Sequence, residues 1–267
     1  MTKHMVVDAA PRPTAAARVL AVLGAFGPQH RRLSLSEIAR RAGLTLPTAH
    51  RLVRELVKWR GLERDENGLY SVGLRLLELA ALSPRWLQLR EAAFPYIDDL
   101  HETTRGNVQL GVRDGLEVIY VEALRAREQN AVNSRVGGRW PMHATGTGLV
   151  LLAHAEADLQ AKVLQPPLRR YTPLTVTDPV EVRRHLAHIR QTGVAVARGQ
   201  ITPHDLVVAV PVLDPAGEVT AALSVVVETE RARPRELAKL LTEASRSVSA
   251  RLARTPISLP VPRRAPG

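Results

Sequence analysis

The chain has 267 residues, of which 45% are apolar, and this is enough to bury the cores of two domains. It contains no cysteine and no apolar run near the ~20 residues that span a bilayer, which excludes disulfides, thiolate metal sites and a membrane-spanning helix. The net charge is +11 and only 3% of the residues are aromatic, so duplex DNA is a better polyanionic partner than a single strand bound by stacking.

The first predicted elements are two short helices. Residues 1–13 lack the apolar core of a signal peptide, and we expect them to form a disordered leader in a cytoplasmic protein. Apolar residues at helical spacing predict a helix over Ala15–Phe26. Ser34 and Glu37 have the spacing of a capping box that starts a second helix, and Gly43 suits the left-handed residue that ends it.

A third helix is predicted directly after Thr45, the next N-cap candidate. Pro47 suits its first turn, where proline loses no needed hydrogen bond. The apolar residues that follow fall on one face, and polar and basic residues occupy the other faces. A capped helix, a glycine turn and a second helix with a polar N-terminal face predict a helix-turn-helix, whose second helix can enter a major groove.

A hairpin is expected next, with strands Leu62–Arg64 and Leu69–Val72. Asn67-Gly68 is a strong turn signal, since both residues tolerate positive φ. A hairpin at this place is the wing of a winged helix, so residues 14–82 are predicted to form a winged helix-turn-helix DNA-binding domain. The predicted DNA contacts are Ser36, Thr45, Pro47, Thr48, His50, Arg51, Arg54, Arg64 and Asn67.

The charge distribution supports DNA binding by this domain. Through Arg75 the chain carries 13 Lys and Arg against six Asp and Glu, whereas the rest carries 24 against 20. A uniformly basic composition would raise both parts alike. Helix-turn-helix geometry also occurs in proteins that never touch DNA, and single residues stay ambiguous. Arg51 and Arg54 can contact phosphates or only solvent, and His50 can pack against the first helix.

Residues 83–254 are predicted to form a second domain of α+β class, and the proline-rich tail 255–267 is expected to be disordered. The boundary is placed at Ser83-Pro84, before a helix over Leu87–Glu102. A central antiparallel sheet with helices on its flanks accounts for the order of the remaining elements. The expected strands are 108–112, 116–123, 131–136, 194–197, 206–213 and 219–227, and the expected helices are 147–155, 156–164, 179–191 and 235–252.

The segment Gly138–Gly148, with the sequence GRWPMHATGTG, is the candidate ligand-binding segment. Its glycines and small hydroxyl residues let backbone amides approach a ligand closely. A helix that starts near Thr147 would present its N-terminus, which attracts a carboxylate. The alternative is that the glycines only form a tight loop.

The chain resembles the IclR family of bacterial transcriptional regulators from about Ala15 to Leu252. In the first domain the resemblance rests on SLSEIARRAGLTLPTAHRLVRELVKWRGLERDENGLYSVGLRLLELA. In the second it rests on LREAAFPYIDDL, VGGRWPMHATGTG, DPVEVRRHLAHIRQTGVAVA and VAVPVLDPAGEVTAALSV. Several motifs in the right order make the resemblance more specific than the helix-turn-helix alone.

The resemblance implies a winged-helix domain that binds a double-stranded DNA operator, a linker helix and a GAF-like effector domain. It implies a homodimer or a dimer of dimers that acts as repressor or activator. Effectors of such proteins are usually small organic or aromatic acids. The effector contacts expected from the resemblance and the candidate segment are Gly138, Met142, His143, Ala144, Thr145, Gly146, Thr147, Gln200 and Ser224.

The chain departs from the family pattern around this expected pocket. The pattern has Gly-Lys-Ala where this chain has Gly148-Leu149-Val150, and a Glu pair where it has Gly199 and Gln200. A glycine expected a few residues later is His204. Because the charged groups are missing, we expect a pocket that is more apolar, differently gated or unresponsive to the usual acid effectors. Ser224 can face this pocket or be a satisfied hydroxyl on a strand.

Neither a metal, a cofactor nor catalysis is indicated. His185 and His188 share a helical face, but with Glu181 they do not complete a typical zinc site, so a solvated helix face is favoured. His143 has no paired nucleophile or carboxylate, and no phosphate loop or nucleophile elbow occurs. Two alternatives to a ligand-responsive regulator stay open. One is a basic architectural DNA-binding protein whose second domain only oligomerises, and the other is an enzyme or metabolite-binding module.

Overall fold

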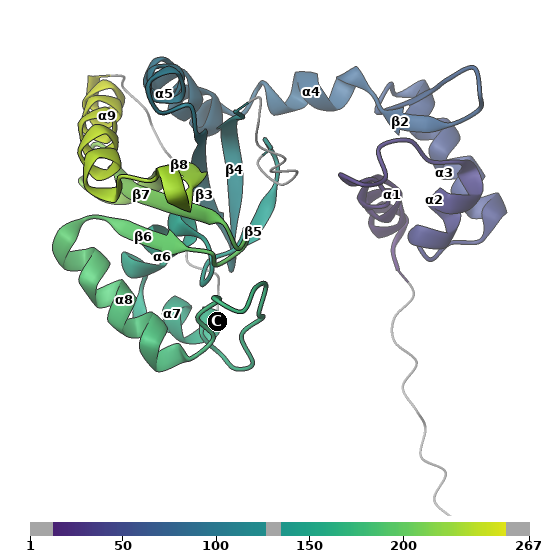
Figure 1. Ribbon diagram of the computed structural model, residues 1–267. Helices are drawn as coiled ribbons and strands as arrows, with labels where there is room; N and C mark the ends of the chain where they lie inside the picture. The colour runs from purple at the N-terminus through teal and green to yellow at the C-terminus, as the bar shows by residue number, and fades with distance from the viewer. Residues whose placement is uncertain (1–12, 127–134, 255–267) are drawn as a thin grey trace, which may run out of the picture. The chain divides into compact units, whose positions relative to one another are not determined.

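The computed structural model describes residues 13–126 and 135–254, which form two compact units divided after Pro84 (Figure 1). The expected disordered tail, and all but the last residue of the expected leader, lie outside the described residues. The first unit contains α1 (Ala15–Gly24), α2 (Leu35–Arg41), α3 (Leu46–Lys58), β1 (Leu62–Arg64), β2 (Tyr70–Val72) and α4 (Leu74–Ala80).

The second unit contains one sheet and the helices that cover it. Its strands are β3 (Asn107–Asp114), β4 (Glu117–Leu124), β5 (Arg139–Pro141), β6 (Ala195–Arg198), β7 (Asp205–Leu213) and β8 (Val219–Glu228). Its helices are α5 (Pro84–Thr104), α6 (Gly146–Ala153), α7 (Ala157–Val163), α8 (Pro179–Thr192), the single 3-10 turn η1 (Thr229–Arg231) and α9 (Pro234–Arg254). Together the units give the α+β class that the sequence predicts.

The first two helices are fixed by the local signals seen in the sequence. The predicted capping box is present at α2, where the Ser34 hydroxyl accepts from the Glu37 N–H and the Glu37 carboxylate accepts from the Ser34 N–H at 2.8 Å. Gly43 has φ +65°, the left-handed conformation predicted for it. α1 ends at Gly24, two residues before the predicted end. Apolar residues of α1, α2 and α3 form the small core of this unit.

The wing hairpin forms between the predicted strands, but its turn differs from the prediction. β1 and β2 pair antiparallel, and Leu33 pairs with Tyr70 through two backbone hydrogen bonds. Only Gly68 of the Asn67-Gly68 dipeptide has positive φ, at +76°. The chain reverses because the Asp65 carboxylate accepts the N–H groups of Asn67 and Leu69, so a side-chain-capped turn replaces the expected two-residue turn.

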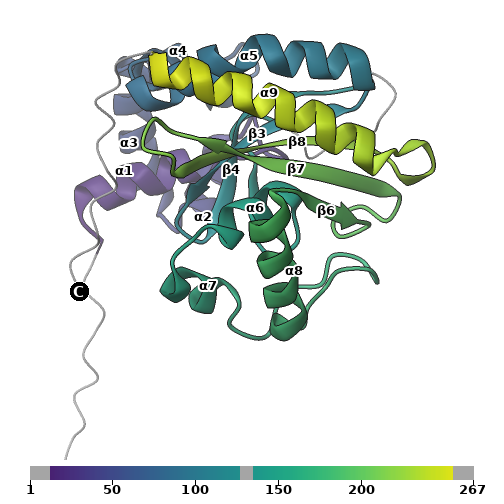
Figure 2. The ribbon, with the colours of Figure 1, turned by 90° about the vertical axis from the view of Figure 1, so that its left-hand side faces the viewer.

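The second unit contains the predicted antiparallel sheet, which has six strands. The strand order, which the sequence did not predict, is β5-β4-β3-β8-β7-β6. Figure 2 shows α5 and α9 along one face and α6 and α8 on the other. The period-two pattern explains this packing. In β7, Leu206 and Val208 belong to the core under α5 and α9, whereas Val207 and Ala209 belong to the core around α6 and α8.

Two predictions about the second unit need correction. The strand expected at 131–136 is described only at its last two residues, which are not a strand, and β5 lies later, at Arg139–Pro141. The helix expected over Leu87–Glu102 extends over Pro84–Thr104, and its earlier start is explained by Pro84, which suits a first helical position. Among the described residues, no helix is both long enough and apolar enough to cross a bilayer.

α6 leaves part of the sheet face beside it uncovered. It has eight residues, about 12 Å of helix, whereas β8 has ten residues, about 33 Å of strand. All eight residues of α6 are buried, so the helix is enclosed on every side. The strand residues beyond its N-terminus are therefore available to form a pocket.

Candidate functional sites

α3 presents a polar face beside a buried apolar stripe. Its inward residues are Ala49, Leu52, Val53 and Leu56, whereas Pro47, His50, Arg51 and Arg54 are exposed. Thr45 has the backbone conformation of an N-cap, but its hydroxyl donates to the Thr48 hydroxyl at 2.9 Å and caps no backbone N–H. The first N–H groups of α3 therefore have no side-chain cap, and they point along an exposed helix end.

The wing is joined by an ion pair to the loop that precedes α2. Arg32, in the loop before α2, forms an ion pair with Asp65 in the wing turn. The hydrogen bond from Arg32 holds the pKa of Asp65 below its usual value. Arg64 and Asn67 are exposed on the wing, and the Arg64 guanidinium lies 5.5 Å from the centre of the Tyr70 ring. The wing thus presents a cation and an amide to solvent near its tip.

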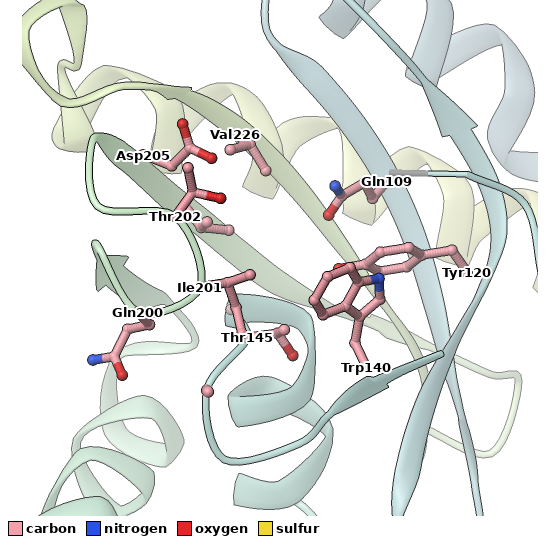
Figure 3. Close-up of a pocket in the computed structure, with 12 residues that line it drawn as sticks. Gln109, Tyr120, Trp140, Thr145, Gln200, Ile201, Thr202, Asp205 and Val226 are labelled. Carbon is pink, nitrogen blue, oxygen red and sulfur yellow. The ribbon is translucent and has the colours of Figure 1, made fainter. Parts of the chain in front are cut away.

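A pocket lies in the second unit, on the sheet face that α6 leaves uncovered. Figure 3 shows Gln109 and Val226 projecting from the sheet, Trp140 and Tyr120 on one side, and Asp205 and Thr202 on another. Its twelve lining residues are Gln109, Tyr120, Trp140, Ala144, Thr145, Gly146, Gln200, Ile201, Thr202, Asp205, Val207 and Val226.

Gln109, which lines the pocket, forms a buried polar pair with a residue of the neighbouring strand. Gln109 on β3 stands opposite Ser224 on β8, and the Ser224 hydroxyl donates to Gln109 Oε1 at 3.2 Å. Both residues are at least 96% buried. Because the Gln109 oxygen accepts this bond, the orientation of its carboxamide in the pocket lining is fixed.

The N-terminus of α6 forms one end of the pocket. The Thr145 hydroxyl donates to the Pro141 carbonyl at 2.8 Å and accepts from the Gly148 N–H at 3.1 Å, so it caps the helix. A Cβ at Gly146 would lie 2.7 Å from Val207 Cγ1, so only glycine lets the helix start so close to β7. The N–H groups of Gly146 and Thr147 have no acceptor within the helix.

The pocket wall formed by residues 200–202 is held, together with the preceding Gly199, by a second loop outside the pocket. The buried Thr172 hydroxyl donates to the Gly199 carbonyl, and the buried Thr175 hydroxyl donates to the Gln200 carbonyl at 2.6 Å. The Gln200 side chain also faces this second loop, because its Oε1 accepts the Val176 N–H at 2.9 Å. In Figure 3 the Gln200 carboxamide points away from the pocket centre.

Comparisons with known proteins identify the family. The family profile described as "Bacterial transcriptional regulator IclR C-terminal" matches residues 83–250, and the "IclR helix-turn-helix domain" profile matches residues 15–66. The chain belongs to the IclR family of transcriptional regulators. It is 31% identical over 223 residues to the HTH-type transcriptional regulator XynR of Escherichia coli, covering 83% of this chain and 88% of XynR.

Two further relatives agree with this assignment. The HTH-type transcriptional regulator BhcR of Paracoccus denitrificans is 32% identical over 222 residues, covering 81% of this chain and 80% of BhcR. An IclR homologue from Microbacterium hydrocarbonoxydans, whose crystal structure contains 4-hydroxybenzoate, superposes with a TM-score of 0.87. That structure is 38% identical and covers 91% of this chain and all of its own. The chain is thus a DNA-binding transcriptional regulator, as the sequence predicts.

The expected effector contacts of this IclR regulator fall into two groups. Ala144, Thr145, Gly146 and Gln200 line the pocket, although the Gln200 side chain faces the outer loop. The others lie outside the lining. Ser224 is hydrogen-bonded to Gln109 from the neighbouring strand, the Gly138 carbonyl accepts the Tyr120 N–H at 3.0 Å, and Met142, His143 and Thr147 are buried.

Sequence reasoning missed most of the pocket lining. Gln109, Tyr120, Trp140 and Asp205 come from strands, and Ile201 and Thr202 follow Gln200 in the same loop, with Val207 and Val226 on β7 and β8. A polar residue within an apolar strand was the available signal for Gln109. The carboxylates that the IclR pattern has near 199–200 are absent from this chain, but Asp205 brings a different carboxylate to the pocket.

Three histidines of the second unit were considered as site residues, and each has an ordinary structural environment. His143 Nε2 lies 3.0 Å from the Arg169 carbonyl and donates to it, and burial lowers the pKa of His143. His188 is exposed and His185 is half-buried on α8. Within residues 13–126 and 135–254, no group of three His, Asp or Glu is placed to hold a metal ion.

Proposed function

We propose that this regulator binds its operator as a homodimer and that a small aromatic carboxylate, bound in the pocket at the N-terminus of α6, changes its operator affinity. Residues 14–82 would contact DNA, and residues 83–254 would bind the effector. A ligand that binds one arrangement of the paired heads better shifts the population toward that arrangement. The pocket beside the α6 N-terminus is the observation that carries this proposal.

The groups around the pocket favour an aromatic acid. Trp140 and Tyr120 present ring surface, and Ile201, Val207 and Val226 present aliphatic surface. Burial raises the pKa of Tyr120 to about 12, so its phenol stays neutral and does not repel a carboxylate. A helix N-terminus attracts an anion by about 0.3–1 kcal/mol even without a cation. The related Microbacterium protein with 4-hydroxybenzoate bound supports the same ligand class.

The dimer proposal rests on α4, the short helix that ends the first unit. None of its residues is buried, and Leu74 and Leu77 are 58% and 66% exposed, followed by Leu82 at 74%. Leu20 on α1 is exposed to the same degree as Leu77. Exposed leucines at this density are typical of an interface rather than a solvated surface. We propose that a second copy of this chain covers them.

Effector binding can be tested on the full chain by tryptophan fluorescence. Trp140 lines the pocket, whereas Trp59 at the end of α3 lies in the other unit. We expect 4-hydroxybenzoate to quench the emission of the wild type and of Trp59→Phe, but much less that of Trp140→Phe. Isothermal calorimetry on the same three proteins reports binding independently of emission. Absence of heat and quenching with every benzoate tested would contradict an aromatic-acid effector.

The regulatory step needs DNA as a second reporter. We expect the protein to bind the region upstream of its own gene more tightly than random DNA at matched salt, and the effector to change the first affinity. Equal affinity for both DNAs, unchanged by ligand, would instead favour a basic architectural protein. We propose regulation in the cytoplasm, with no catalytic turnover of the ligand. Recovery of unchanged ligand after incubation tests the absence of turnover.

A further inference from the structure

Asp205 gives the pocket a second polar end that the family pattern did not predict. It is the first residue of β7, and it lies half-buried in the pocket wall beside Thr202 (Figure 3). Among the described residues that line the pocket, Asp205 is the one carboxylate, and no Lys, Arg or His accompanies it. The pocket therefore has a hydrogen-bond-donating end at α6 and an accepting end at Asp205.

The spacing of these two ends follows from one strand. Gly146, at the start of α6, lies directly on the Val207 side chain, since a Cβ at Gly146 would stand only 2.7 Å from Val207 Cγ1. Asp205 is two residues before Val207 and on the same face, so it lies about 6.6 Å further along β7. The two ends are therefore displaced from each other along β7, and a benzene ring with substituents at opposite positions presents a carboxylate and a donor in opposite directions, as this arrangement requires. Trp140 and Tyr120 flank the space between the two ends.

The surroundings of Asp205 decide what it can accept. Glu228 is its direct partner in the β7–β8 register, so a second carboxylate already stands nearby. Burial is the main cause that raises the pKa of Asp205, and Glu228 raises it further, while the Thr202 hydroxyl and His204 act in the opposite direction. A ligand carboxylate at this end would be repelled, because no cation in the lining offsets the two acids. A neutral donor would satisfy the Asp205 oxygens.

Building on the proposed effector site, we propose that Asp205 is a specificity-determining residue. It selects aromatic carboxylates that carry a neutral hydrogen-bond donor, a hydroxyl or an amino group, on the ring carbon opposite the carboxylate. The carboxylate binds at the N–H groups of Gly146 and Thr147, and the donor binds Asp205. Benzoates with an apolar group at that position give Asp205 no ligand hydrogen bond and displace water from its carboxylate, and dicarboxylates place two like charges together.

The test is a ligand panel measured by calorimetry on the full chain. The panel is 4-hydroxybenzoate, 4-aminobenzoate, 4-methylbenzoate and benzene-1,4-dicarboxylate. For the wild type we expect the hydroxy and amino acids to bind about 10- to 100-fold more tightly than the methyl analogue, the range of one hydrogen bond to a charged group. The dicarboxylate should bind most weakly.

Two substitutions at Asp205 separate hydrogen bonding from packing. Asp205→Leu should bind 4-methylbenzoate at least as well as the wild type and lose the preference for 4-hydroxybenzoate. Asp205→Asn keeps an acceptor and adds a donor, so it should retain part of that preference and improve dicarboxylate binding about tenfold or more. Glu228→Gln is the matched control, because it removes a neighbouring negative charge outside the pocket lining. It should keep the ranking of the wild type.

The outcomes separate this proposal from the one on which it rests. If no benzoate binds the wild type, both the aromatic-acid effector and the role of Asp205 are wrong. If benzoates bind but Asp205→Leu keeps the hydroxyl preference, the effector site stands and Asp205 is not its selector. If Glu228→Gln shifts the ranking as much as Asp205→Asn does, selection comes from general charge and the direct hydrogen bond is refuted.

Discussion

The two units of this regulator form their sites in opposite ways, one on an exposed helix face and the other in a buried pocket. In the first unit α3 buries one stripe and turns His50, Arg51 and Arg54 to solvent, so the surface proposed for DNA is outside. In the second unit α6 is buried on every side, and the pocket is the part of a sheet that this short helix does not reach. An outward site follows from one helix, whereas an inward site depends on what several strands bring together.

The same contrast appears at two threonines that precede these helices. Thr45 stands at the N-cap of α3 but bonds the Thr48 hydroxyl, so the exposed helix end keeps its N–H groups uncapped by side chains. Thr145 caps Gly148, which satisfies one N–H in a buried place. An exposed helix end can leave its amides to water or to a phosphate, but a buried one cannot. A side-chain cap is therefore needed for a helix N–H that neither solvent nor a ligand can reach, as at Gly148.

The largest effect is expected from a substitution among the exposed leucines of α4 in the first unit. Leu77→Glu should convert the dimer to monomer and weaken operator binding by about 100-fold or more, because paired heads gain their affinity from effective concentration. Light scattering after gel filtration gives the mass, and a gel shift gives the affinity. Leu116→Glu, at an exposed turn leucine of the second unit, is the control and should change neither. A dimeric Leu77→Glu protein would refute the proposed interface.

The first unit could be predicted from sequence because its signals are local. The capping box, Gly43 and the period of α3 each lie within a few residues, and each is present in the structure. The wing turn was only partly predicted, since the Asp65 side chain, and not the Asn67 backbone, reverses the chain. Even there the partner lies within four residues.

The pocket could not be predicted in the same way, because its residues meet through strand register. Gln109 and Ser224 are 115 positions apart, and only the β3–β8 pairing places them side by side. Asp205 is the first residue of a strand whose other residues are apolar. It faces the pocket because it lies two residues before Val207 and therefore on the same face of β7. β5 was misplaced because three residues that include Pro141 carry too little pattern to predict a strand.

The next test concerns the cations of α3. Arg54→Ala should weaken operator binding about tenfold at moderate salt and reduce the salt slope by about one ion, if the guanidinium meets a phosphate. Arg51→Ala should behave alike. Affinities measured over a salt series give both quantities. Arg183→Ala removes an exposed arginine from α8 and should leave the slope unchanged. An unchanged slope for both α3 variants would remove these residues from the interface.

A smaller effect is expected from the cap of α2. Ser34→Ala should lower the free energy of unfolding by about 1 kcal/mol, as measured by denaturant titration. Hydrogen bonds from Ser34 hold the pKa of Glu37 below its usual value, so the capping contribution is present above the ordinary carboxyl pKa and is lost as the pH falls below it. Ser36→Ala changes a residue of the same helix that makes no cap and is the control. Equal free energies of unfolding for the two variants would show that the capping box does not contribute to stability.

The smallest effect is expected at the pocket of the second unit, where the ionised Asp205 carboxylate lowers the stability of the fold. Burial and Glu228 raise the pKa of Asp205, so the folded protein holds this proton more tightly than the unfolded chain does. The favourable contribution is present below the unfolded pKa and is lost as the pH rises through the folded pKa. Asp205→Asn should therefore raise the melting temperature slightly at pH 7, and the difference should vanish toward acid pH. A variant less stable than the wild type at pH 7 would show that the fold needs the Asp205 charge, and a carboxylate kept at a cost to stability points instead to ligand selection.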